Sequence, residues 1–500
     1  MHGAAAACRR QRLGFTVSTR RTGDSESGNS DQNVKRRLRW GLALAAYAGI
    51  SAYYRFRQQP PGIDGGPCRR FRVPAESIGF HHDTTWYEDD ERQSVLQITD
   101  ELIRLIEAAR RFVVMDVFLF SLHHADRASD YLPTTRQIVD AFRVHERPAW
   151  FITDPINTSY GSWISPPLQW LEQAGVQVVV TNLRKLRDNN LLYSPAWRMF
   201  LQWIDTSLPP RFKNPLEPNA TTTPWAILEA INARGNHRKL LIADNGDDYV
   251  SFITSSNFED ASSYFGNTSV TIRSAGVARQ LLEAEKAVAR MSGVEIPVEI
   301  PEAGEGEGDC EVTPLMGMDI KHALLGDLRR ASRGDRLFLF AQFLSERELI
   351  EALVRASRRG VSGVLVLDQN KVDFGNPKLG YPNQLTGPEL ASRTGFELRW
   401  ANIRREEYHN QFMLLETPER CIFHVGSANY NRRSLSATVL ETNVRIDAPL
   451  DSVLGRQVLD YAHWMASDPR SLPYEYGRRQ TSPLKYWFYR FLEATGSGTF

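Results

Sequence analysis

The chain has 500 residues, 42% of them hydrophobic and 10% aromatic, enough for a large buried core in more than one domain. Its formal net charge is +1, but residues 1–60 hold eleven Lys and Arg against three Asp and Glu, which leaves −7 on the remainder. This charge argues against nucleic-acid binding by the body, and four scattered cysteines exclude a disulfide framework.

The N-terminal region divides into a leader and a short apolar segment. Residues 1–34 lack apolar periodicity, so we expect them to be disordered. Residues 35–57 join a basic cluster to an apolar run that is shorter than the ~20 residues of a comfortable transmembrane helix. Aromatic residues at its ends, Trp40 and Tyr54, favour a membrane anchor over a cleaved export signal. We expect residues 40–54 to anchor the chain with the body exported, periplasmic or equivalent, although a cytoplasmic location stays open.

The rest of the chain contains an internal repeat. Three segments of the first half match three of the second, each a helical pattern followed by an apolar strand: 102–121 with 324–345, 135–157 with 346–370, and 170–184 with 389–404. Strands alternating with helices predict an α/β domain, and the repetition predicts two. The expected fold is therefore two similar α/β domains, each a mixed sheet flanked by helices.

The repeat sets the expected domain bounds. The first domain spans 78–299, with an insertion at about 183–230, and the second spans 315–475. Between them, residues 300–314 are rich in Gly, Pro and Glu, as expected for a linker. The insertion is aromatic and apolar, so it either faces lipid beside the site or packs as core. The amphipathic tail, 476–500, either lies on a bilayer surface or docks on the body.

Both copies of the repeat end on the same polar pattern. His237 is followed at offsets of 2, 7, 18 and 20 by Lys239, Asp244, Ser255 and Asn257, and His409 is followed at the same offsets by Gln411, Glu416, Ser427 and Asn429. Residues two apart on a strand point to the same face, so each His is expected to share a face with the residue at offset 2. Such a repeated pair of polar clusters is not typical of a core.

These residue types suit the cleavage of a phosphodiester. One imidazole can attack phosphorus and a second, protonated imidazole can give its proton to the departing alkoxide near neutral pH. Donors would hold the non-bridging oxygens: Lys239, Gln411, Ser255, Asn257, Ser427 and Asn429. We expect neither a metal ion nor a cofactor. Because Gln411 replaces a Lys, we expect an attenuated site whose positive charge comes mainly from Lys239.

The motif resembles the phospholipase D superfamily signature, His-x-Lys-x4-Asp followed by Gly-Ser-x-Asn. The first copy meets the His/Lys/Asp part and has Thr254 in place of Gly, while the second meets Gly-Ser-x-Asn but has Gln411 and Glu416. Wider segments such as "VVMDVFLFS" and "GSANYNRRSL" are similar to a bacterial, membrane-associated, cardiolipin synthase-like branch. The resemblance covers roughly residues 78–500.

This resemblance implies a site at a pseudo-twofold interface to which each half contributes one His. It makes His237 the nucleophile and His409 the acid, although the roles could be exchanged. Glu441 corresponds to an acidic residue that orients a catalytic His, and Asn267 stands there in the first copy. The predicted catalytic set is His237, His409, Lys239, Asp244, Glu416 and Glu441.

The expected function is a membrane-associated phospholipid phosphodiesterase or phosphatidyltransferase that works through a phospho-histidine. Its partners would be a phospholipid substrate, a membrane surface, and water or an alcohol as acceptor. Two alternatives stay open: a nuclease-type phosphodiesterase of the same superfamily, and a non-catalytic phospholipid-binding scaffold. The sequence does not decide the headgroup, hydrolysis against transfer, or the oligomeric state.

Overall fold

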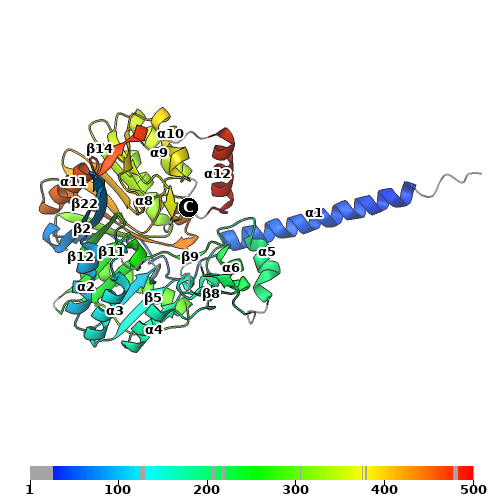
Figure 1. The fold of residues 1–500 in the computed structure, drawn as a ribbon, viewed down its shortest axis with the longest axis horizontal. Coiled ribbons are helices and arrows are strands. Elements are labelled where there is room, and N and C mark those ends of the chain that lie inside the picture. The colour runs from blue at the N-terminus through cyan, green and yellow to red at the C-terminus, as the bar shows by residue number, and fades with distance from the viewer. Residues whose placement is uncertain are drawn as a thin grey trace, which may run out of the picture. The chain divides into compact units, whose positions relative to one another are not determined.

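The structure is a computed structural model. It describes residues 26–122, 130–204, 209–214, 220–246, 248–304, 306–373, 376–377, 380–476 and 482–498. Contacts divide the chain into two compact units, residues 1–50 and 51–500. Helix α1 (Glu26–Phe56) begins within the predicted leader, whose first 25 residues lie outside the described part (Figure 1). No described helix is both long enough and apolar enough to cross a membrane.

The first large sheet is built from residues 78–273. Its strand order is β3 (Glu91–Val95), β2 (Ile78–Glu88), β12 (Asn267–Arg273), β11 (Tyr249–Thr254), β10 (Lys239–Asp244), β4 (Val113–Val117), β5 (Ala149–Thr153) and β6 (Gln177–Val180). Strands β4, β5 and β6 are parallel, and the other neighbours are antiparallel. Three helices cover one face: α2 (Ile98–Ala108), α3 (Thr134–His145) and α4 (Pro166–Gln173) (Figure 1).

The second sheet repeats this arrangement. Its order is β1 (Phe71–Val73), β13 (Cys310–Met316), β22 (Thr442–Pro449), β20 (Arg420–Gly426), β19 (Gln411–Glu416), β14 (Arg336–Ala341), β15 (Ser362–Leu367), β18 (Glu397–Ala401) and β23 (Ser471–Pro473). Strands β14, β15 and β18 are parallel. Helices α8 (Met318–Arg330), α9 (Arg347–Arg358) and α10 (Asn383–Arg393) supply buried side chains to its outer core.

The two sheets share one order from β2 to β6 and from β13 to β18. This agreement confirms the predicted mixed α/β fold with flanking helices. A pseudo-twofold axis between the halves stays a prediction, as do the domain bounds. One strand crosses between the regions: β1 lies before the first sheet in sequence but pairs with β13 of the second. In addition, β13 begins at Cys310, inside the range expected as linker.

A shared core joins the two sheets. Leu240 and Ile242 on β10 face the same hydrophobic cluster as Phe412 and Leu414 on β19, together with helices α7 (Ala275–Met291) and α11 (Val453–Met465). The alternate residue Leu241 faces the outer cluster under α2 and α3. Because both faces of these strands are buried, their sequences are continuous apolar runs. This packing fixes the strands whose ends carry the polar motif.

The insertion and the tail combine buried and exposed apolar side chains. The insertion forms α5 (Ser194–Met199), β7 (Phe212–Lys213), β8 (Thr221–Thr222) and α6 (Pro224–Ala230). Trp197 is fully buried, so the insertion packs as core in part, while Trp203 is 76% exposed; contact of the insertion with lipid stays a prediction. Helix α12 (Pro483–Thr495) docks through the buried Glu493, which accepts hydrogen bonds from Ser345 Oγ and the Arg432 amide, both at 2.8 Å. Two further short pairs are β9 (Gly235–Asn236) with β21 (Val439–Leu440), and β16 (Val372–Asp373) with β17 (Asn376–Pro377).

Candidate active site

The repeated motif lies at the ends of two central strands. His237 lies between β9 and β10, and His409 lies two residues before β19. Strand β9 of the first half pairs in parallel with β21 of the second, and the His237 amide donates to the Leu440 carbonyl at 2.8 Å. The halves therefore exchange backbone contacts directly beside His237.

Both histidines line one cavity of about 300 Å³. Residues from the two halves surround it: Phe118, Tyr160, Arg234, His237 and Asn257 from the first, and Gln342, Glu407, His409, Asn429, Asn431, Arg433 and Glu441 from the second. Five predicted site residues are thus brought together here, two histidines, two asparagines and Glu441. A cavity of this size with a few convergent polar groups is typical of a small-molecule site.

Each histidine is held by a residue of the other half. His237 Nδ1 lies 3.0 Å from Glu441 Oε2, and His409 Nδ1 lies 3.1 Å from Asn267 Oδ1. Both acceptors contact Nδ1, and Nε2 of His237 lies next to Lys239 Nζ, at 3.1 Å. Glu441 therefore contacts the histidine of the opposite half, and its role in orienting a catalytic His stays a prediction. Its partner at His409 is a neutral amide, so the two histidines have unequal environments.

The two predicted phosphate-binding serines donate hydrogen bonds to the residues that contact the histidines. Ser255 Oγ donates to Asn267 Oδ1 at 2.9 Å, and Ser427 Oγ donates to Glu441 Oε2 at 2.5 Å. Both side chains are fully buried, and neither lines the cavity. That they bind phosphate stays a prediction, which their position outside the cavity lining does not support. They position the residues that orient the histidines.

Lys239 is fully buried beneath His237. Its Nζ atom lies 3.1 Å from His237 Nε2 and 5.3 Å from the centre of the Phe118 ring. Desolvation lowers the pKa of Lys239 to about 7, although Glu441 and Asp116 oppose the shift. Bound phosphate would restore the charged form, because an anion favours the ammonium. Lys239 is therefore suited to respond to an anionic substrate.

Burial also lowers the pKa of both imidazoles. Desolvation lowers the pKa of His237, and Glu441 partly offsets this shift. Desolvation, followed by the charge of Lys239, places the pKa of His409 well below its usual value. Neutral imidazoles are therefore favoured in the empty cavity, and His409 is the harder of the two to protonate.

Gln411 occupies the position equivalent to Lys239 but is turned to a neighbour. Its side chain is fully buried, and Nε2 donates to Asn429 Oδ1 at 3.0 Å. Within the described part of the chain, its Oε1 has no hydrogen-bond partner. Gln411 does not line the cavity, so its contribution in this structure is to hold Asn429. Phosphate contact by Gln411, as expected from the sequence, stays a prediction.

The two acidic residues of the motif do not lie with the histidines. Asp244 ends β10, roughly 16 Å along the strand from Lys239. It accepts hydrogen bonds from the backbone amides of Arg111 and Phe112 at 2.6 and 3.1 Å. Glu416 ends β19 in the equivalent place. Both acidic residues therefore lie too far from the histidines to belong to the predicted catalytic set. Asp244 instead holds the backbone at the start of β4.

Sequence reasoning missed Arg433, which lines the cavity. Its Nε is buried and has no hydrogen-bond partner in the described residues. Arg433 follows His409 by 24 positions, and the same offset from His237 gives Ala261. The first copy therefore carries Lys239 and Ala261, and the second carries Gln411 and Arg433. Comparison of the copies at this offset would have revealed one cation per half.

The described residues contain no group of three or more His, Cys, Asp or Glu side chains placed to hold a metal ion. The cavity presents imidazoles, amides and guanidinium groups from both halves, and carboxylates from the second half. Such a set can bind an anion, transfer a proton and supply a nitrogen nucleophile.

Comparison with known proteins finds a family model that matches part of the second half. Residues 324–465 match this model, which is described as cardiolipin synthase, PLD-like domain. This part of the chain is therefore similar to a phospholipase D-like domain. The matched range contains β14 to β22, His409, Gln411, Arg433 and Glu441. The predicted resemblance to the phospholipase D superfamily is therefore confirmed.

Solved structures extend the likeness to the fold. Phosphatidylserine synthase from Haemophilus influenzae Rd KW20 is similar with a TM-score of 0.52 and 10% identity, covering 87% of this chain and 96% of that one. Polyphosphate kinase from Porphyromonas gingivalis gives a TM-score of 0.43 at 12% identity, over 84% of this chain and 53% of the kinase. This chain spans about half the length of that kinase. No curated protein matches the sequence significantly.

Proposed function

We propose that this phospholipase D-like chain is a phospholipid phosphodiesterase or phosphatidyltransferase that works through a phospho-histidine. The observation that carries the proposal is the pair His237 and His409 in one cavity, each held through Nδ1 by a residue of the other half. Two imidazoles in one cavity are the minimum set for attack on phosphorus and protonation of the leaving group.

His237 is the nucleophile in this proposal. Nε2 attacks phosphorus and the bond to the headgroup oxygen breaks. His409, whose protonated form the bound phosphate anion favours, gives that oxygen its proton. The carboxylate of Glu441 stabilises the positive charge that develops on the His237 ring, while Asn267 offers His409 only a neutral acceptor. Water or an alcohol then attacks phosphorus, His409 takes the acceptor's proton, and the His237–phosphorus bond breaks.

Two cations neutralise the phosphate in this proposal. Lys239 is fully buried beneath His237 and does not line the cavity, so it acts on the phosphate through its charge, whereas Arg433 lines the cavity from the other half. A guanidinium with a fixed fork of donors suits phosphate oxygens. Arg433 thereby supplies the positive charge that Gln411 lacks. The site is asymmetric, but Lys239 is not its sole cation in this proposal.

Membrane association is also proposed, and it is supported by exposed apolar side chains on α12 and the insertion. Those on α12 are Leu484, Trp487, Phe488 and Phe491, and those on the insertion include Phe200 and Trp203. The two elements are adjacent, because the Leu191 amide donates to the Thr495 carbonyl at 2.9 Å. Aromatic residues on an amphipathic helix suit the bilayer interface. The anchor at residues 40–54 and an exported body stay part of the proposal.

The test is a product assay with phosphatidylglycerol vesicles. We expect wild-type protein to release cardiolipin, or phosphatidic acid and glycerol, and His237→Gln to release none. Glu416→Gln serves as the matched control, because this residue lies at the far end of β19. Absence of every product with wild-type protein, when a related enzyme is active in the same vesicles, would favour a non-catalytic lipid-binding scaffold.

A further inference from the structure

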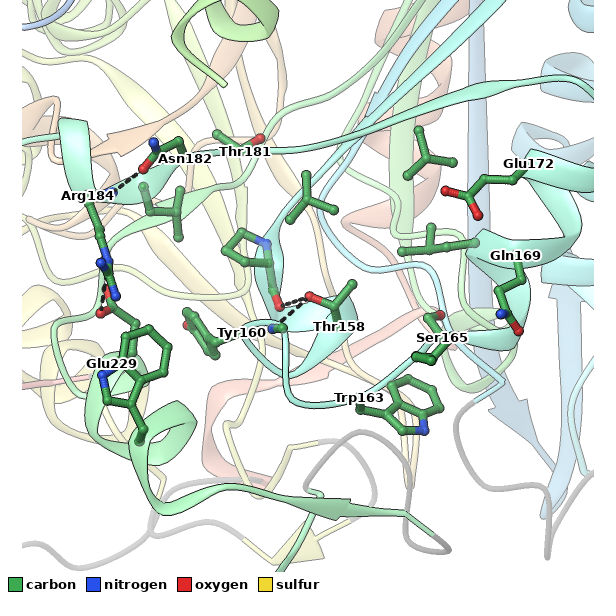
Figure 2. Close-up of a pocket in the computed structure, with 18 residues that line it drawn as sticks. Thr158, Tyr160, Trp163, Ser165, Gln169, Glu172, Thr181, Asn182, Arg184 and Glu229 are labelled. Atoms are coloured by element: carbon green, nitrogen blue, oxygen red, sulfur yellow. Dashed lines mark hydrogen bonds and ion pairs between the residues drawn. The ribbon is translucent and has the colours of Figure 1, made fainter. Parts of the chain in front are cut away.

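A second cavity of about 480 Å³ lies at the edge of the first sheet. It is bounded by the edge strand β6, helix α4, the loop after β5 and helix α6. Apolar side chains form most of its wall: Trp163, Ile164, Leu168, Val178, Val180 and Trp225. In Figure 2, Thr181 and Asn182 lie across it from Tyr160 and Trp163. We call this cavity the β6 groove.

Some polar residues of the β6 groove are engaged, while Ser165 Oγ and Trp225 Nε1 have no hydrogen-bond partner among the described residues. Thr181 Oγ1 accepts a hydrogen bond from Asn236 Nδ2 at 3.0 Å, and Thr158 Oγ1 donates to the Pro155 carbonyl at 3.0 Å. Glu229 forms a 2.5 Å ion pair with Arg234. The groove therefore offers its occupant mainly hydrocarbon contact, with charged groups at its margins. Such a surface favours an apolar chain over a polar ligand.

The β6 groove adjoins the catalytic cavity. Tyr160 lines both, and the ion pair joins Glu229 of the groove to Arg234 of the catalytic cavity. Tyr160 also has a left-handed backbone, with φ of +55° between Ser159 at +46° and Gly161 at +82°. This conformation is strained for a bulky residue, and such strain clusters at ligand sites. It places an aromatic ring at the boundary between the two cavities.

We propose that the β6 groove binds one acyl chain of the phospholipid whose phosphate lies between His237 and His409. This inference rests on the proposed function. The two cavities are adjacent at Tyr160, and a glycerophospholipid joins a phosphate and a hydrocarbon chain within one molecule, so it can occupy both. The insertion contributes to the same site, because Arg184 and Trp225, near its two ends, form part of the groove wall.

The first experiment compares chain lengths. Val180 is 38% exposed on the edge strand, so Val180→Glu places a charge in the groove without disturbing the core. Val144→Glu is the matched control, since Val144 is 66% exposed on α3 and lies outside both cavities. Burial of one methylene changes binding about fourfold, so a few lost methylenes suffice for a large effect.

We expect Val180→Glu to raise the KM for dioleoyl phosphatidylglycerol at least tenfold more than the KM for dihexanoyl phosphatidylglycerol. Val144→Glu should change neither. An equal effect of Val180→Glu on both lipids, or no effect on either, would overturn the inference.

The second experiment does not need turnover. Phosphatidylglycerol with a photoreactive diazirine near the end of one acyl chain is irradiated with His237→Gln protein, and the labelled peptides are mapped by mass spectrometry. We expect label on the segments that carry Trp163 and Val180, and less label after Val180→Glu. Label confined to other segments would overturn the inference. If wild type forms no product yet the groove is labelled, the proposed catalysis fails and the acyl site stands.

Discussion

Glu441 Oε2 lies 3.0 Å from the Nδ1 atom of His237, a residue of the opposite half of the chain. Ser427 Oγ donates to the same carboxylate oxygen at 2.5 Å, so Glu441 is fixed by its own half and directs the histidine of the other. Asn267 and Ser255 repeat the relationship at His409. Each half therefore depends on the other for a correctly oriented imidazole.

Replacing Glu441 with Gln tests this relationship. The substitution keeps the shape but removes the charge that stabilises the His237 ring, and we expect turnover to fall by ~100-fold or more. Because Glu441 raises the pKa of His237 against desolvation, its loss should move the acidic limb of the pH–rate profile to lower pH. Glu416→Gln should leave both the rate and the profile unchanged. An unshifted profile with slower turnover would indicate a merely structural role for Glu441.

Removal of the guanidinium at Arg433 tests the second cation. A charge-assisted hydrogen bond contributes roughly 1.5–3 kcal/mol, so Arg433→Gln should slow turnover about ten- to hundredfold. Gln411→Lys alone should leave activity intact or raise it, because Lys can also donate to Asn429. In the Arg433→Gln background, Gln411→Lys should restore part of the lost rate. Wild-type turnover by Arg433→Gln would refute the proposal that Arg433 compensates for the missing Lys at position 411.

Lys239 should lower the free energy of unfolding although activity requires it. Lys239→Met removes a buried ammonium, and we expect loss of activity with a free energy of unfolding higher by ~1–3 kcal/mol. The depressed pKa of about 7 means that the unfolded chain holds this proton more tightly than the folded one. Stability from this residue is therefore lowest below pH 7 and rises toward pH 10.5. Urea titrations at pH 6 and pH 9 should show this rise in wild type and a smaller rise in Lys239→Met.

Asp244 should affect stability rather than catalysis. The amides of Arg111 and Phe112 and the Arg111 side chain outweigh desolvation and lower the pKa of Asp244. The carboxylate therefore stabilises the fold at neutral pH, and this contribution is lost as the pH falls through the lowered pKa. Asp244→Asn should reduce the free energy of unfolding by ~1–3 kcal/mol while turnover per folded molecule stays unchanged. Slower turnover without a change in the denaturant midpoint would contradict this assignment.

Most of the fold follows from local sequence patterns. The apolar runs of β10 and β19 and the equal offsets after His237 and His409 predict the strands and the repeat, because strand burial and strand periodicity are written in the sequence. The two histidines and the two asparagines of the motif meet in one cavity as expected.

The partners of these residues could not be read from the sequence. The motif spacing makes Ser255 and Ser427 look equivalent to the asparagines two positions on, but tertiary packing turns both hydroxyls toward Asn267 and Glu441. The crosswise pairing likewise depends on β9 lying beside β21, a contact more than 200 residues apart. Arg433 was missed because it lies outside the signature, although its offset from His409 is a signal.

Detection of the covalent intermediate tests the proposed phospho-histidine mechanism most directly. Protein is mixed briefly with phosphatidylglycerol, quenched, and its peptides are examined by mass spectrometry under conditions that preserve phospho-histidine. We predict a phosphatidyl adduct on His237 in wild type and none in His237→Gln. An adduct on His409 would reverse the assigned roles, and product formation with no adduct on either histidine would contradict the proposed mechanism.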